Sequence, residues 1–164
     1  MSEHATPQKQ LSQSYCDLPP NQLQTIQEAL GILESRLQCR DSLINSSEVK
    51  HFCQLEISQE PEEIFCCLFL DNQHRLIAFE RLFQGTIASA VVYPRVVARR
   101  ALALNAAAII YAHNHPSGVF EPSEADIAIT KRLRDALNLI EVRSLDHIIV
   151  GTEGAMSFAD RGLM

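Results

Sequence analysis

The apolar positions divide the chain into a helical first part and a second part in which strands and helices alternate. Between residues 19 and 60 the apolar residues recur every three or four positions. The first stripe consists of Leu23, Ile26, Leu30, Leu33 and Leu37. This spacing predicts a helix of about five turns with one apolar side. The stripe fits two partners: the rest of its own domain, or the same helix of a second copy in a homodimer. A shorter helix is expected from residue 46.

After Pro61 the helical spacing gives way to continuous apolar runs. Residues 64–70 and 106–112 are almost entirely apolar, which is typical of central strands buried on both faces. Turn-forming residues at 71–74 make 75–83 the expected hairpin partner of the first run. Further short strands are expected at 87–93, 140–142 and 147–150, with a terminal turn beginning at 157. Helices are expected from Pro94 to about residue 104, and from Ser123 to about Asn138. This alternation predicts an α/β or mixed α+β fold with helices around one sheet.

Composition narrows the class of protein. The 164 residues are 46% hydrophobic and 21% charged, as in ordinary globular proteins. No apolar run has membrane-spanning length, and the N-terminus has no basic-then-apolar signal peptide. The five cysteines form no C-x-x-C pair, which favours reduced thiols and a cytoplasmic location over a cysteine-bound metal.

Charge is unevenly distributed along the chain. The net charge is −6, yet residues 75–143 carry 9 basic and 6 acidic side chains. The basic residues of this region include Arg95, Arg99, Arg100, Lys131, Arg132 and Arg134. They could bind an anionic partner such as nucleic acid, but solvated helix faces explain them more simply. The negative net charge of the whole chain is also unfavourable for nucleic-acid binding.

The candidate chemistry is concentrated just after the apolar run at 106–112. In an extended segment, residues i and i+2 point to the same side, so His113 and His115 can direct both imidazoles to one point. The first turn of the next helix can bring the carboxylate of Asp126 to the same point. Two imidazoles and one carboxylate leave a fourth position on a tetrahedral zinc ion open for water, which is the catalytic pattern. The sequence therefore predicts a mononuclear zinc hydrolase site.

Asp126 also has a structural explanation. Residues 123–126 read S-x-x-D, which is a capping-box pattern at a helix start. The two explanations differ in whether the Asp126 side chain points back along its own backbone or across to His113 and His115. A zinc-activated water also needs a general base, for which Glu60, Glu62, Glu63 and Glu80 are candidates that spacing alone does not separate.

These residues resemble a known signature. Glu63, His113, His115, Ser123 and Asp126 match the JAMM (MPN+) metalloprotease pattern E…H-x-H-x(7)-S-x(2)-D. Residues 113–118 read HNHPSG, the form found in the RadC branch. Further segments similar to that family lie at 63–65, 82–86, 94–95, 105–108 and 145–151. On these residues, the chain from about residue 47 to 164 is identified as a member of the RadC family.

The resemblance implies a fold and a set of roles. The fold would be the JAB/MPN-type three-layer arrangement, with a central mixed sheet flanked by helices, similar to that of cytidine deaminases. His113, His115 and Asp126 would bind Zn²⁺. Glu63 would be the general base, and Ser123 would hydrogen-bond the oxyanion that forms on a peptide or protein substrate. The expected organisation is a flexible tail at 1–18, a helical extension at 19–60 and the catalytic domain at 61–164.

Two functions compete with the hydrolase. RadC proteins are described as DNA-repair proteins, so the chain could be a repair or recombination accessory of a mobile element in which the zinc is mainly structural. It resembles short members that lack the N-terminal helix-hairpin-helix region, which weakens the case for direct DNA binding. A third hypothesis is a non-catalytic module. Asp146 and His147 either support the metal ligands from outside or form a hydrogen-bonded structural pair.

Overall fold

A computed structural model describes residues 18–38, 45–85 and 91–164. Its centre is a five-stranded sheet in the order β2-β1-β3-β4-β5. The strands are β1 (Ile64–Leu70), β2 (Leu76–Gln84), β3 (Ala108–Asn114), β4 (Arg143–Val150) and β5 (Ala155–Ser157). The pair β3–β4 is parallel, whereas β1 pairs antiparallel with both β2 and β3, and β4 with β5. The sheet is therefore mixed, as expected.

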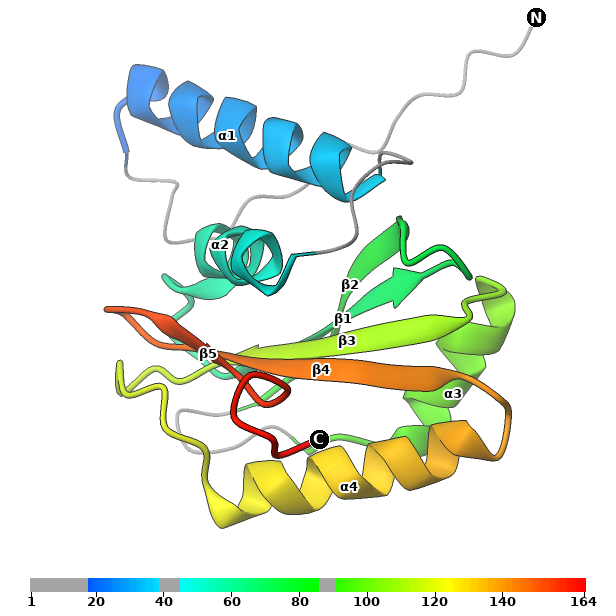
Figure 1. Ribbon diagram of the computed structural model, residues 1–164. Coiled ribbons are helices and arrows are strands. Elements are labelled where there is room, and N and C mark those ends of the chain that lie inside the picture. The colour runs from blue at the N-terminus through cyan, green and yellow to red at the C-terminus, as the bar shows by residue number, and fades with distance from the viewer. Residues whose placement is uncertain (1–17, 39–44, 86–90) are drawn as a thin grey trace, which may run out of the picture.

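Helices cover both faces of this sheet, giving three layers (Figure 1). Helices α1 (Pro20–Gln38) and α2 (Ser46–Ile57) lie on one face, and α3 (Pro94–Ala103) and α4 (Glu124–Asn138) lie on the other. This arrangement is consistent with the JAB-type fold and confirms the expected fold class. Within the described residues, no helix is long and apolar enough to cross a membrane.

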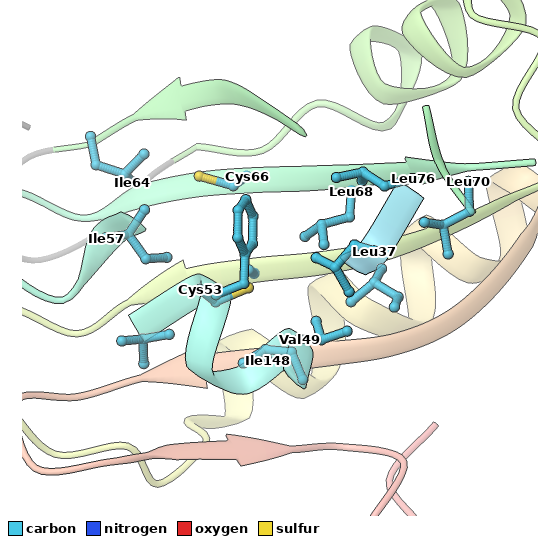
Figure 2. Packing of buried hydrophobic residues seen from close by; sticks show 14 of the residues in the cluster. Leu37, Val49, Cys53, Ile57, Ile64, Cys66, Leu68, Leu70, Leu76 and Ile148 are labelled. Atoms are coloured by element: carbon cyan, nitrogen blue, oxygen red, sulfur yellow. The ribbon is translucent and has the colours of Figure 1, made fainter. Parts of the chain in front are cut away.

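Each face of the sheet has its own hydrophobic core. Figure 2 shows the core under α1 and α2, where Leu37, Val49 and Cys53 pack against Cys66 and Leu68 of β1. On the opposite face, Phe65, Cys67 and Phe69 pack with residues of α3 and α4. Every residue of β1 and β3 is buried, because both strands are covered on both faces. This double burial is why the two segments read as continuous apolar runs.

The apolar stripe of α1 packs against other parts of the same chain. Leu30 and Leu37 are buried, and Ile26 and Leu33 are half-buried in the same core as α2. The helix therefore packs on its own chain, as the first of the two explanations for its stripe requires.

The three shorter strand predictions have different outcomes. Residues 87–90 of the strand predicted at 87–93 lie outside the described residues, and 91–93 are not in a strand. The strand predicted at 140–142 is wrong: residues 139–141 form a turn, and the left-handed φ of 58° at Glu141 interrupts the extended backbone before β4. The expected strand at 147–150 is the second half of the longer β4. Ser157 closes β5, and the expected turn follows it.

The topology brings four chain segments to one edge of the sheet. β3 ends there, α4 begins there, and the parallel strand β4 also ends there. β1 is antiparallel to β3 and pairs Phe65 with His113, so its first residues lie at the same edge. Residues 60–64, 113–115, 123–126 and 147–150 are thereby gathered around one point, although they are far apart in the sequence.

Candidate metal centre

His113 and His115 direct their ring nitrogens at each other from the end of β3. Their Nε2 atoms are 3.0 Å apart. His113 is 1% exposed, and the side chain of His115 is partly exposed. The convergence follows from strand alternation, since both side chains leave the same face of the sheet.

The Asp126 carboxylate completes the cluster. Its Oδ1 atom lies 3.2 Å from His113 Nε2, and its Oδ2 atom lies 3.5 Å from His115 Nε2. Among the described residues, these three side chains form a group that could hold a metal ion, each offering one ligand atom. Donor atoms about 2.0–2.2 Å from a tetrahedral zinc ion are about 3.4 Å apart, close to these separations.

The two explanations for Asp126 are compatible in the structure. Ser123 is the N-cap of α4, and its Oγ accepts a hydrogen bond from the Asp126 backbone N–H over 3.2 Å. In return, Asp126 Oδ2 accepts from the backbone N–H of Ser123 over 2.7 Å and from its hydroxyl over 2.6 Å. The capping box therefore holds the carboxylate in place while its Oδ1 faces His113. One residue fixes the helix start and faces the histidines.

A chain of hydrogen bonds determines which nitrogen of His113 carries a proton. Thr130 Oγ1 lies 2.5 Å from the backbone carbonyl oxygen of Asp126, a distance at which one oxygen must donate, and only the hydroxyl has a hydrogen. Thr130 therefore accepts from His147 Nδ1, 2.6 Å away. The Nε2 atom of His147 is then an acceptor, and His113 Nδ1, 2.8 Å away, donates to it. We assign the lone pair of His113 to Nε2, facing Asp126.

His115 has the same tautomer for a simpler reason. Its Nδ1 atom lies 2.7 Å from the carbonyl oxygen of Val119, which can only accept. The lone pair of neutral His115 is therefore also on Nε2. With both imidazoles neutral, two lone pairs and a carboxylate face one another, so the cluster attracts a positive charge, either a metal ion or a proton on an imidazole. The donor set fits a metal ion.

The pKa directions show the same attraction of the cluster for positive charge. The hydrogen bond with Asp126 raises the pKa of His115, despite its partial burial. Burial alone would raise the pKa of Asp126, but its hydrogen bonds with His113 and His115 outweigh burial and hold that pKa below its usual range. Burial, followed by the neighbouring His113, keeps the pKa of His147 well below its ordinary value. His147 is therefore neutral, as its acceptor role requires.

Glu63 immediately precedes β1 and is half-buried. Because Phe65 pairs with His113, continuing this antiparallel register brings Glu63 opposite His115. The charge of Glu63 also contributes to the raised pKa of His115. The other candidate bases point elsewhere: Glu60 binds Arg81, Glu80 binds Arg100, and Glu62 binds Gln84.

His147 and Asp146 have different surroundings. His147 is fully buried and contacts His113 through the hydrogen bond described above, with its ring also packed on Phe158. The Asp146 carboxylate accepts from the backbone N–H groups of His147 and Ala159 and from the Ser157 hydroxyl. Asp146 thus fixes the backbone of His147 and contacts none of the three candidate ligands through these bonds.

Two residues of this centre were not singled out from the sequence. The Thr130 hydroxyl orients His147. The buried side chain of Asn114 binds the backbone on both sides of Glu63. A buried polar residue on an apolar face is the sequence signal that points to Thr130.

Glycines allow the loop after the histidines to pack closely. A Cβ atom on Gly151 would lie 2.2 Å from the carbonyl oxygen of Gly118. Gly118 itself has a φ of 84°, in the left-handed region that favours glycine. The loop that carries Val119, the partner of His115, therefore rests directly on the backbone that follows β4.

Known proteins are similar in sequence to the part of this chain that contains the site. The family model for the RadC-like JAB domain matches residues 43–163. A UPF0758 protein of Thioalkalivibrio sulfidiphilus is 56% identical over 132 residues, covering 80% of this chain and 59% of that protein. A UPF0758 protein of Ectopseudomonas mendocina is 54% identical over 145 residues, covering 87% of this chain and 64% of that protein.

A UPF0758 protein of Alcanivorax borkumensis is 67% identical over 102 residues, covering 62% of this chain and 46% of that protein. The chain thus spans less than two thirds of the length of these curated relatives. The family model covers well over half of the chain, including both histidines, Asp126 and Glu63. This chain belongs to the RadC-like JAB domain family.

Proposed function

We propose that this domain is a zinc-dependent hydrolase that cleaves amide bonds in a peptide or protein substrate. The observation that carries the proposal is the convergence of His113, His115 and Asp126, with both histidine lone pairs turned inward by partners outside the cluster. Three protein ligands are one fewer than a closed structural zinc site uses. The partly exposed side chain of His115 leaves the site accessible to solvent.

Zinc is proposed over other metals because of the ligand types. Two imidazoles and one carboxylate suit zinc well, whereas sites for magnesium or calcium are built mainly from oxygen ligands. When bound, zinc acts as a Lewis acid that makes water a nucleophile at neutral pH.

The chain's own residues would move the protons. Glu63, which immediately precedes β1, would take a proton from the attacking water and pass it to the leaving amine. Ser123 would donate its hydroxyl hydrogen to the oxyanion that develops on the substrate carbonyl. In the structure this hydrogen is directed to Asp126 Oδ2, so Ser123 would exchange one acceptor for another.

Metal content and cleavage, measured together, test this proposal. We expect about one zinc per chain in the wild type and none in His115→Ala, because the loss of one imidazole leaves only two ligands. An unbiased peptide-library assay of the wild type and Glu63→Gln then tests cleavage. Cleavage that is lost in Glu63→Gln supports the hydrolase. A folded protein without zinc at saturating metal excludes it, and zinc without cleavage favours a non-catalytic module.

A DNA-related accessory function is the second candidate. It is favoured by Arg95 and Arg99 on α3 and by Lys131 and Arg132 on α4, which are exposed on helices covering the same face of the sheet. Binding to a DNA duplex should then weaken steeply with salt and disappear in Arg95→Ala/Arg99→Ala or Lys131→Ala/Arg132→Ala. Absence of binding at low salt would count against this function.

A further inference from the structure

Asn114 lies between the two histidines in the sequence, but its side chain is on the opposite face of β3. Side chains alternate along a strand, so Asn114 points away from the side that His113 and His115 share. It is the last residue of β3 and is 1% exposed. A buried carboxamide needs partners for its oxygen and its amino group, because an unpaired polar atom in the interior is costly.

All partners of Asn114 belong to one short segment. Its Oδ1 atom accepts from the backbone N–H of Ile64 over 2.7 Å. Its Nδ2 atom donates to the carbonyl oxygens of Glu60 and Glu62 over 3.2 and 3.0 Å. These three backbone groups lie on both sides of Glu63, so Asn114 hydrogen-bonds to the backbone before and after that residue.

Other contacts hold the same segment from the side of β2. Arg81 binds the Glu60 carboxylate over 2.6 Å and the carbonyl oxygen of Glu56 over 2.8 Å. The backbone N–H of Gly85 donates to the carbonyl oxygen of Glu63 over 2.8 Å. The backbone around Glu63 is thus fixed at several points.

The chemistry of the three bonds requires a carboxamide. One acceptor oxygen and two N–H donors on a single methylene group are what asparagine offers. Aspartate would set a negative oxygen against two carbonyl oxygens, and serine has only one hydrogen to donate. Alanine would leave the Ile64 N–H and two buried carbonyls without this partner.

We propose that Asn114 is a positioning residue that ties the strand carrying the metal ligands to the segment carrying Glu63. Through it, the general base and the two histidines keep one fixed separation, as a preorganised site requires. This inference rests on the proposed function, since it assigns a purpose to the separation between Glu63 and the metal.

Amide hydrogen exchange tests the positioning without any substrate. In Asn114→Ala we expect exchange in residues 60–64 to accelerate about tenfold or more, because the Ile64 N–H loses its acceptor. Asn114→Ser, a milder variant, should give a smaller acceleration and keeps the test open if the alanine variant unfolds. Ser157→Ala removes a buried hydroxyl that bonds Asp146 and should leave residues 60–64 unchanged. Zinc content should stay at wild-type level in both Asn114 variants.

Binding of acetohydroxamate to the zinc-loaded protein tests the link to Glu63. This compound loses a proton on binding zinc, so a well-placed carboxylate strengthens its binding. By calorimetry we expect Glu63→Gln to weaken binding about tenfold and Asn114→Ala to weaken it several-fold. In a Glu63→Gln background, Asn114→Ala should have no further effect, because no base remains to be positioned.

The outcomes separate the inference from the function on which it rests. Wild-type exchange in residues 60–64 of Asn114→Ala overturns the inference alone. So does an Asn114→Ala effect of equal size in both backgrounds, because that result indicates a general structural role. A wild type that binds no zinc ends the proposed function and the inference together, and elemental analysis identifies that case. Glu63→Gln that binds acetohydroxamate like the wild type rejects Glu63 as the base.

Discussion

His113 Nδ1 and His147 Nε2 lie 2.8 Å apart, and both side chains are buried near the end of β3. Because Thr130 makes His147 an acceptor at this nitrogen, His113 must donate from Nδ1 and present its other nitrogen to Asp126. Neither Thr130 nor His147 is a candidate ligand, yet together they decide whether His113 can bind a metal. Residues outside the ligand set therefore prepare the site.

Thr130→Val tests this chain of hydrogen bonds. Valine has nearly the same shape but no hydroxyl, so His147 Nδ1–H would lose its acceptor and the tautomer of His113 would no longer be fixed. We expect zinc affinity to fall about 10- to 100-fold in a chelator-competition titration. Stability should fall by about 1–3 kcal/mol, because a buried donor is left unpaired.

Thr130→Ser is the matched control, since it keeps the hydroxyl. Its zinc affinity should stay near that of the wild type. Equal losses of affinity in the valine and serine variants would show that packing at this position, rather than the hydroxyl, supports the site.

The two contributions of Asp126 can be separated by substitution. Asp126→Asn keeps an oxygen that can accept from Ser123 but removes the negative charge that faces His113. We expect zinc affinity to fall more than about a hundredfold while the helix start is largely retained. Ser123→Ala should do the opposite, costing about 1 kcal/mol of stability through the lost N-cap while zinc still binds.

Elemental analysis and urea denaturation of the two variants check this prediction. If Asp126→Asn retained a full complement of zinc after dialysis, the carboxylate would be a capping residue only.

The stability of the protein should depend on pH through Asp146. Burial raises the pKa of this carboxyl, although the Ser157 hydroxyl and two backbone N–H groups partly offset the effect. A raised pKa means that the folded state holds a proton more tightly than the unfolded chain does. Protonation of Asp146 therefore adds stability as the pH falls from above the folded pKa toward the unfolded value of about 3.9.

Asp146→Asn is neutral at every pH and isolates this contribution. Urea denaturation of the zinc-free proteins gives the unfolding free energy of the wild type minus that of Asp146→Asn. This difference should increase as the pH is lowered from 7.5 to 4.5. A difference that stays constant or shrinks over this range would indicate that the hydrogen bonds, not burial, dominate at Asp146.

Two glycine substitutions should change stability in opposite directions. In Gly151→Ala the new Cβ would meet the backbone of Gly118, which must move and carry the His115 loop with it. We expect a loss of about 1–3 kcal/mol together with weaker zinc binding. Gly31→Ala in α1 meets nothing within 4 Å and should stabilise the protein by about 0.5–1 kcal/mol through helix propensity.

Thermal unfolding and the same chelator titration check both glycine variants. The contact between Gly151 and Gly118 would be unimportant for the site if Gly151→Ala bound zinc as tightly as the wild type.

The sequence by itself determined the local features of this protein. The continuous apolar runs at 64–70 and 106–112 predicted β1 and the buried part of β3, because strands covered on both faces have no polar side. The H-x-H spacing placed two imidazoles on one side of a strand, since alternation with a period of two is a local property. The S-x-x-D spacing likewise predicted the start of α4. The family resemblance added Glu63, which spacing alone could not select.

Only the tertiary structure decided how distant residues meet. The strand order put the start of β1 beside the end of β3, so Asn114 contacts the backbone of residues 60–64. The parallel pairing of β3 and β4 put His147 against His113, which lies 34 positions earlier in the chain. The histidine tautomers depend on atoms that folding brings within about 3 Å of one another. The same is true of the hydrogen bonds from Asn114 to the backbone around Glu63 and of the two roles of Asp126. No periodicity along the chain encodes such contacts, because they depend on which surfaces of the sheet and helices pack together.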